Sequence, residues 1–147
     1  MPVFERSVLI DAPVEEVFAF HEQPDALTLL SPAFPPVRLL RRTGKGIELN
    51  SRLELSIGPF RWVALHTGYT RNRRFEDHQE AGPFDQWIHR HDFESVGGRT
   101  RLTDRIEYRL PGGPAFNTLF GWVVNLGLRN MLRHRHNVTR KLCEHKS

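Results

Sequence analysis

Two histidines and one aspartate occupy positions where the sequence otherwise places apolar side chains. His89 and His91 stand two residues apart in the stretch WIHRHDF, and Asp104 follows in the stretch LTDRIEYRL. Alternate residues of a strand share a face, so both imidazoles project to the same side as Trp87 and Phe93. An imidazole beside a carboxylate can orient a polar group of a ligand, transfer a proton or bind a metal ion.

The segment 84–111, FDQWIHRHDFESVGGRTRLTDRIEYRLP, predicts a two-stranded hairpin that positions these residues. Gly97-Gly98 is the expected turn, because glycine supplies the positive φ that a two-residue turn requires. The register that follows places His91 opposite Asp104. The other facing pairs are Phe93 with Leu102, His89 with Ile106, and Trp87 with Tyr108. Every mainly apolar position then falls on one side, which is expected to be buried.

Four interpretations of the polar residues are open. In the first, the two histidines, Asp104 and Gln79 orient a polar group of a ligand in a mostly apolar pocket. In the second, His91 and Asp104 are a structural pair that binds nothing, and His89 has no obvious protein partner. In the third, Asp104 orients a histidine as a general base, which is the chemistry of an aldol-type cyclase. In the fourth, both imidazoles share a metal ion with Asp104, and His66 could join them. That set lacks a clear fourth ligand, so we predict no metal and no cofactor.

The composition is that of a globular protein with a real core. The chain has 147 residues, of which 39% are hydrophobic and 26% are charged, and we expect one domain over 1–147. No apolar run approaches the length that crosses a bilayer, and the first residues lack the pattern of a signal peptide. The single cysteine, Cys143, leaves no internal disulfide. A reducing, cytoplasmic location is therefore expected.

The net charge of +4 raises the question of a nucleic-acid partner. Basic residues cluster at 71–74 and at 129–141, but neither cluster has an aromatic stacking platform or a helix-turn-helix pattern. We interpret both as solvated surface and predict no nucleic-acid partner. Residues 133–136 are expected to form a solvated last part of a helix, on which Asn130 and His134 are the candidates to face the sheet. A monomer or a homodimer fits this surface.

Hydrophobic periodicity and turn residues predict the order of elements. Short helices at 14–21 and 26–30 follow a first strand at 3–10. Further strands are expected at 37–42, 47–57, 60–70 and 73–80, before the hairpin and a long helix at 115–143. Strand 60–70 leaves its inward face open, with either Trp62 and His66 or Val63, Leu65 and Tyr69 turned to the core. The predicted apolar side of the long helix consists of Phe116, Leu119, Phe120, Val123, Leu126, Met131 and Val138.

This order predicts an α+β fold in which a curved antiparallel sheet of six or seven strands wraps around the C-terminal helix. Four local patterns carry a resemblance to a known family: I-D-A-P-V-E-E-V-F at 10–18, F-x-D-x-Q-x-x-G-P-F at 75–84, W-x-H-x-H-x-F at 87–93 and D-x-I-x-Y-x-L-P at 104–111. With them, the chain resembles the SRPBCC superfamily of START-like and Bet v 1-like proteins, over essentially its whole length. The resemblance implies the helix-grip fold and an internal cavity for a hydrophobic ligand. It implies no particular reaction, because the same fold hosts carriers and polyketide cyclases.

We therefore predict that the chain binds a small hydrophobic molecule, such as a lipid, a polyketide or an aromatic compound, between its sheet and its long helix. The alternative is a cyclase- or dehydratase-like enzyme that uses His89 or His91 with Asp104 as general acid and base. The predicted ligand-binding residues are Phe75, Gln79, Trp87, His89, His91, Phe93, Asp104, Ile106, Tyr108 and Phe120.

Overall fold

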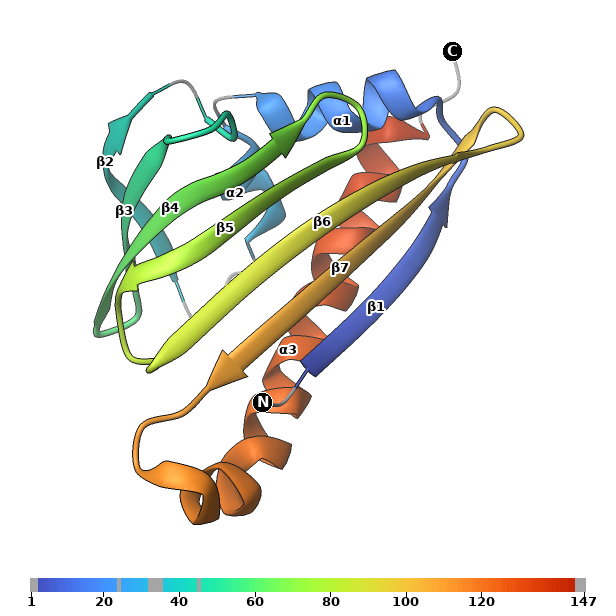
Figure 1. Ribbon diagram of the computed structural model, residues 1–147. Coiled ribbons are helices and arrows are strands. Elements are labelled where there is room, and N and C mark those ends of the chain that lie inside the picture. Colours follow the sequence, from blue (N-terminus) through green and yellow to red (C-terminus); the bar gives the residue numbers. More distant parts are fainter. Residues whose placement is uncertain (1–2, 24, 32–35, 45, 145–147) are drawn as a thin grey trace.

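The sheet of the computed structural model is antiparallel, and seven strands form it in the described part of the chain, residues 3–23, 25–31, 36–44 and 46–144. The strands lie in the order β1-β7-β6-β5-β4-β3-β2 (Figure 1). Their bounds are Val3–Ile10 (β1), Val37–Thr43 (β2), Arg52–Ile57 (β3), Phe60–Thr70 (β4), Arg74–Ala81 (β5), Gln86–Val96 (β6) and Arg99–Arg109 (β7). The helices are α1 (Val14–Glu22), α2 (Ala26–Leu30) and α3 (Gly113–Cys143). This is the predicted helix-grip arrangement, with α3 lying across one face of the sheet.

The hairpin of β6 and β7 has the predicted register. His91 pairs with Asp104, His89 with Ile106 and Trp87 with Tyr108. Gly97 and Gly98 have φ angles of 57° and 80°, which fits a two-residue turn with positive φ at both positions. Burial alternates along both strands, so the face that carries the histidines is the inner one.

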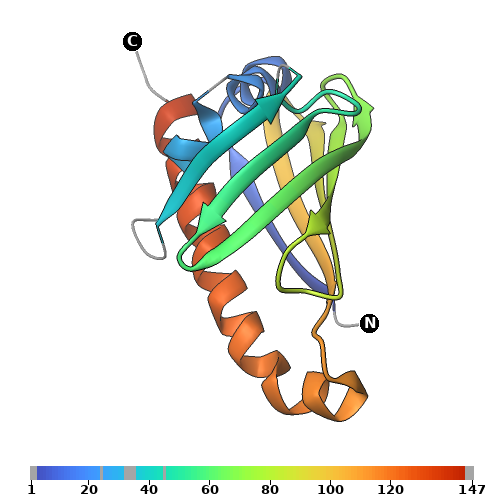
Figure 2. The same ribbon diagram turned by 90° about the vertical axis from the view of Figure 1, so that its left-hand side faces the viewer.

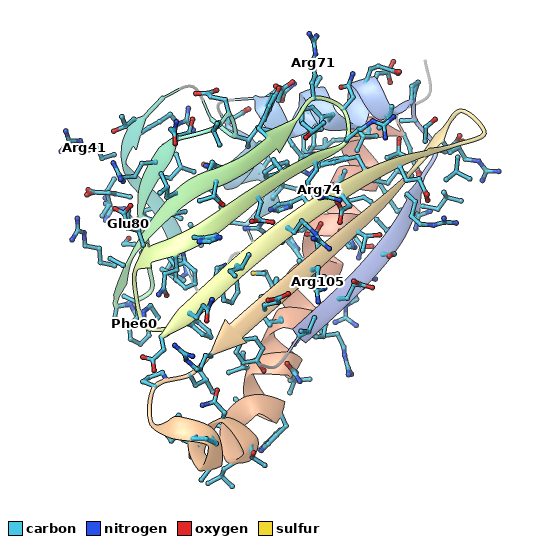
Figure 3. All side chains as sticks on the ribbon, viewed as in Figure 1. Arg41, Phe60, Arg71, Arg74, Glu80 and Arg105 are labelled. Atoms are coloured by element: carbon cyan, nitrogen blue, oxygen red, sulfur yellow. The ribbon has the colours of Figure 1, made fainter. Side chains whose placement is uncertain are left out.

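The outer face of the sheet carries the charged residues of the same strands. Arg74 of β5 forms an ion pair of 2.6 Å with Asp92 of β6, and Arg52 of β3 forms one of 2.8 Å with Glu80 of β5. Figure 3 shows Arg74 and Arg105 on this face, on the side of the sheet away from α3. The period-two pattern therefore separates a solvated ionic face from a buried face.

The strand predicted at 47–57 is shorter than expected. It begins only at Arg52, because the chain turns at Asn50, whose φ is 70°, and the exposed Leu49 belongs to this turn rather than to a strand. Positive φ interrupts the extended conformation that alternation alone suggests.

A β-bulge settles which residues of β4 face the core. The register between β4 and β5 shifts between His66 and Gly68. His66 is buried before the shift, as is Trp62, whereas Tyr69 packs inward after it. An extra residue in one strand reverses the parity beyond it, so each of the two predicted faces is correct for part of the strand.

The apolar side predicted for the first half of α3 is wrong. Leu119, Phe120 and Val123 are exposed, and the buried residues of the helix are Gly121, Leu128, Leu132, His136, Thr139 and Cys143. Figure 2 shows the first half of α3 extending past the end of the sheet, so its apolar residues have no strand to pack on. None of the helices in the described ranges is long and apolar enough to span a membrane.

Candidate functional site: a buried histidine–aspartate cluster

The inner faces of β5, β6 and β7 bring the candidate residues together. Asp77 of β5 pairs with His89 of β6, and Phe75 pairs with His91. Across the other edge of β6, His91 pairs with Asp104. Because same-face residues on neighbouring strands lie side by side, two histidines are held between two carboxylates. Both histidines and Asp104 are buried, and the Asp77 side chain is 15% exposed.

Asp104 lies at the centre of this cluster. His89 Nε2 donates to Asp104 Oδ2 over 3.3 Å, and His91 Nδ1 lies 3.6 Å from Asp104 Oδ1. The expectation that His89 has no protein partner is therefore wrong. His89 stands opposite Ile106, and Asp104 is its diagonal neighbour, within reach of a long side chain.

Asp77 adds a second carboxylate that the sequence did not place in the site. Its Oδ2 lies 3.5 Å from His91 Nε2, so the His91 ring lies between Asp77 and Asp104. Because alternate residues of a strand share a face, Asp77 lies on the same face as Phe75 and Gln79. This alternation would have been sufficient to include Asp77 among the predicted site residues.

His136 of α3 completes the cluster from the opposite side. Its Nε2 lies 3.7 Å from Asp104 Oδ1, and its Nδ1 is 2.6 Å from Nη1 of Arg6 in β1. A guanidinium group only donates, so Nδ1 accepts and the ring proton is on Nε2, directed toward Asp104. The prediction of a solvated stretch at 133–136 is wrong at His136, and the buried residues Leu128, Leu132 and Thr139 show the spacing that would have placed it in the core. Asn130 is exposed and His134 is half-buried.

The charges of the cluster are set by these neighbours. Burial alone would raise the pKa of both carboxyls, but the surrounding histidines outweigh it, holding the pKa of Asp104 well below its usual range and lowering that of Asp77 to about 2. Burial also opposes the charge on His91, yet Asp104 and Asp77 together raise its pKa. His89 responds in the opposite direction, because burial and the neighbouring His91 lower its pKa. Near neutral pH the cluster thus holds two carboxylates and a neutral His89 beside a more basic His91.

Two polar atoms of the cluster remain without a hydrogen bond. Asp104 Oδ1 and His136 Nε2 are both buried and lack a hydrogen-bond partner within the described part of the chain. Their separation of 3.7 Å is too long for a good hydrogen bond. A buried polar atom that lacks a partner is costly, so this acceptor and donor form a site where a polar group could bind.

Aromatic rings surround the polar cluster on two sides. His91 stacks on Phe75 with ring centroids 3.9 Å apart, and on His89 with centroids 3.8 Å apart. On the second side, Trp87 packs against Trp62 with ring centroids 5.0 Å apart. Trp87 belongs to the apolar cluster that also contains Tyr108 and Leu128. An apolar wall with a few convergent polar atoms is the usual composition of a small-molecule site.

Three other predicted site residues have different surroundings in the structure. Gln79 donates to Phe84 O and accepts from Phe84 N, so its amide holds the loop between β5 and β6. Phe93 packs with Phe18 and His21 in a separate apolar cluster beneath α1. Phe120 is exposed on α3 and is not brought to the histidines.

Asp77, His89 and His91 could also hold a metal ion, since their ligand atoms all lie within 4.8 Å of one another. Two histidines and one carboxylate are a known donor set for transition metals. The same atoms contact one another and Asp104, so a metal ion would have to replace these contacts.

Two surface grooves lie outside this site. One, of about 430 Å³, is lined on the outer face by Arg41, Arg52 and Glu80 among others, and the second, of about 850 Å³, lies beside the turn between β4 and β5. Neither groove is lined by His89, His91 or Asp104. The predicted cavity between sheet and helix stays a prediction, because its candidate walls pack against one another.

Comparison with known proteins settles the family. Residues 10–134 match the model of the family described as polyketide cyclase / dehydrase and lipid transport. The chain belongs to this family. No curated protein matches the chain.

Solved structures share the fold over nearly the whole chain. A START superfamily protein from Mycobacterium smegmatis is 18% identical with a TM-score of 0.68, over 97% of each chain. Norcoclaurine synthase from Thalictrum flavum, in complex with dopamine and hydroxybenzaldehyde, is 14% identical with a TM-score of 0.73, over 99% of this chain and 88% of its own. A nucleoside-diphosphate sugar epimerase from Corynebacterium glutamicum is 25% identical with a TM-score of 0.72, over 94% of this chain and 28% of its own. These likenesses confirm the predicted helix-grip fold, and the family match over residues 10–134 confirms the predicted superfamily.

Proposed function

We propose that the protein binds a small hydrophobic molecule between the inner face of its sheet and α3, with one polar group of the ligand hydrogen-bonded to Asp104 and His136. One observation carries this proposal. Asp104 Oδ1 and His136 Nε2 are an acceptor and a donor that face each other in the core without a hydrogen bond. A hydroxyl group can accept from the imidazole and donate to the carboxylate at once, which would satisfy both atoms.

The apolar part of the ligand has a matching surface beside these atoms. One buried apolar cluster lies at the end of the sheet past which the first half of α3 extends. Its members include Trp62, Trp87, Ile106, Tyr108 and Leu128. Ligand entry there requires the rings to move, since they are in contact without a ligand. The family description, which includes lipid transport, supports a ligand of this kind.

Native mass spectrometry of the purified protein tests the proposal first, by looking for a small molecule that copurifies. Fluorescence titration with fatty acids and aromatic polyketides tests it independently, in a Trp122→Phe variant whose remaining tryptophans are the buried Trp62 and Trp87. We expect saturable changes in emission, and an affinity loss of about tenfold or more in Asp104→Asn. The matched control is Asp92→Asn, which alters a carboxylate on the outer face. The absence of both a copurified molecule and a saturable titration would refute the proposal.

An acid–base enzyme is the second candidate, and the contact from His89 to Asp104 favours it. A neutral histidine that donates to a buried carboxylate is oriented to accept a proton at its other ring nitrogen. Incubation with linear polyketide thioester analogues, followed by chromatography, separates this candidate from a carrier. An enzyme loses turnover by about a hundredfold or more in His89→Asn, whereas a carrier forms no product with either protein.

A further inference from the structure

The solvent-facing side of α3 is apolar over the first half of the helix. Trp122 is 67% exposed and Leu119 is 63% exposed, although both are large hydrophobic residues. They belong to an exposed set, here named the α3 apolar face, that consists of Phe116, Leu119, Phe120, Trp122, Val123 and Leu126.

The spacing of this face shows that it is a continuous surface. Residues 116, 119, 120, 123 and 126 recur at steps of three and four, which places them on one side of the helix. The buried residues Gly121, Leu128 and Leu132 lie on the opposite side, toward the sheet. The first half of α3 is thus apolar on two sides, and only one of them is used by the core. Large apolar side chains exposed side by side in this way mark an interaction site.

The solvent-exposed surface of α3 becomes basic in the second half of the helix. Arg129, Arg133, Arg140 and Lys141 are exposed there. Between Tyr108 and Cys143 the sequence contains no aspartate and no glutamate. An apolar face therefore continues into a cationic one. The helix itself carries no acidic residue, and Arg140 pairs with Glu144 just after the helix ends.

We propose that the α3 apolar face docks on an anionic membrane surface, with the helix lying in the plane of the interface. In this arrangement Trp122 and its apolar neighbours enter the boundary between head groups and acyl chains. Arg129 and Arg133 then contact lipid phosphates. Amphipathic helices that bind membrane surfaces combine Trp, Phe and Leu with basic residues in this way.

The charge distribution favours a lipid surface over a second copy of the chain. A symmetric pairing through the α3 apolar face would place Arg129 and Arg133 of one copy beside the same acid-free helix of the other. These arginines would then find no carboxylate on the facing helix. Lipid phosphates supply the missing negative charge. The proposal does not depend on a ligand inside the protein, because every residue of this face is exposed.

Vesicle cosedimentation tests the proposal with the whole chain. We expect binding to vesicles of phosphatidylcholine mixed with phosphatidylglycerol, and weak or no binding to phosphatidylcholine alone. A blue shift of tryptophan emission should accompany binding and be lost in Trp122→Phe. Replacement of Leu119 by Asp should lower partitioning by about tenfold or more. Leu49→Asp is the matched control, since Leu49 is 54% exposed on a turn away from α3.

The basic half of the helix is tested separately. Arg129→Glu with Arg133→Glu should lower partitioning into anionic vesicles by about tenfold or more, with a steep dependence on salt. Arg71→Glu with Arg73→Glu, in the exposed turn between β4 and β5, should have a smaller effect. Failure of the wild-type protein to bind anionic vesicles overturns the proposal. A stable dimer in analytical ultracentrifugation that Leu119→Asp dissociates also overturns it, because a second copy then covers the face. Neither result bears on ligand binding in the core.

Discussion

Asp104 accepts a hydrogen bond from His89 and lies within 4 Å of His91 and His136, three imidazoles that come from two different layers of the protein. Its charge is compensated by His91, whose pKa it raises. The pairing of His91 with Asp104 could be predicted because hairpin register follows from turn length and alternation. The contacts of His89 and His136 could not be derived in the same way. They depend on side-chain length across a diagonal and on the rotation of α3.

Loss of the Asp104 charge should destabilise the fold. We expect Asp104→Asn to lower the free energy of unfolding by about 3 kcal/mol or more, since a buried ion pair that loses one partner leaves the other uncompensated. Urea unfolding at neutral pH measures the change. Asp92→Asn removes a half-exposed carboxylate from the outer face and should cost less than about 1 kcal/mol. Equal costs for the two variants would contradict the central position of Asp104.

At the scale of elements, α3 is where sequence and structure differ most. Phe116, Leu119, Phe120, Val123 and Leu126 follow helical periodicity as well as the buried residues do. Periodicity identifies an amphipathic stripe but does not say whether the sheet reaches it. Gly121 was the informative residue, because its main-chain oxygen accepts from the Tyr108 hydroxyl over 3.2 Å, a close approach that marks the inner side.

Alanine substitutions distinguish the two sides of α3. Leu132→Ala should lower the free energy of unfolding by about 2–5 kcal/mol, because Leu132 is fully buried and its loss leaves a cavity. Leu119→Ala should change it by less than about 0.5 kcal/mol, since an exposed leucine contributes little to the core. Chemical denaturation of both variants measures the difference. If Leu119→Ala lowered the free energy of unfolding more than Leu132→Ala, the side of α3 predicted from the sequence would be the one that packs on the sheet.

For the whole molecule, composition and patterning were sufficient to predict an α+β fold, with a helix on one face of a sheet and the helices and strands in the observed order. The β-bulge at His66–Gly68 could not be predicted, because one extra residue in a strand changes the hydrophobic pattern very little. Asp77 differs from the bulge, because strand parity was sufficient to place it on the inner face with Phe75 and Gln79. Its contact with His91 was harder to predict, since it depends on the register of β5 with β6, which no tight turn specifies.

Acid should destabilise the whole protein through His21. Burial lowers the pKa of His21 to about 4, so between pH 6.5 and 4 the unfolded chain binds a proton there that the folded chain does not. Stability contributed by the neutral ring is present above pH 6.5 and is lost as pH falls, by about 3 kcal/mol in total. We expect a smaller loss over this range in His21→Leu, measured by urea unfolding at several pH values. Parallel pH dependences in the two proteins would contradict the assignment.

The pairing of β1 with β7 determines how early the sheet can form while the chain is being synthesised. Val3 pairs with Glu107 and Ile10 with Thr100, so the first strand has no neighbour until the last strand has left the ribosome. Until then the hydrogen-bonding edge of β1 stays unpaired, and Arg6 must wait longer still for His136, which follows β7 in the chain. Chains whose contacts are this distant in sequence fold slowly and expose strand edges while they wait. The nascent chain, rather than the finished protein, is thus the form most prone to aggregate.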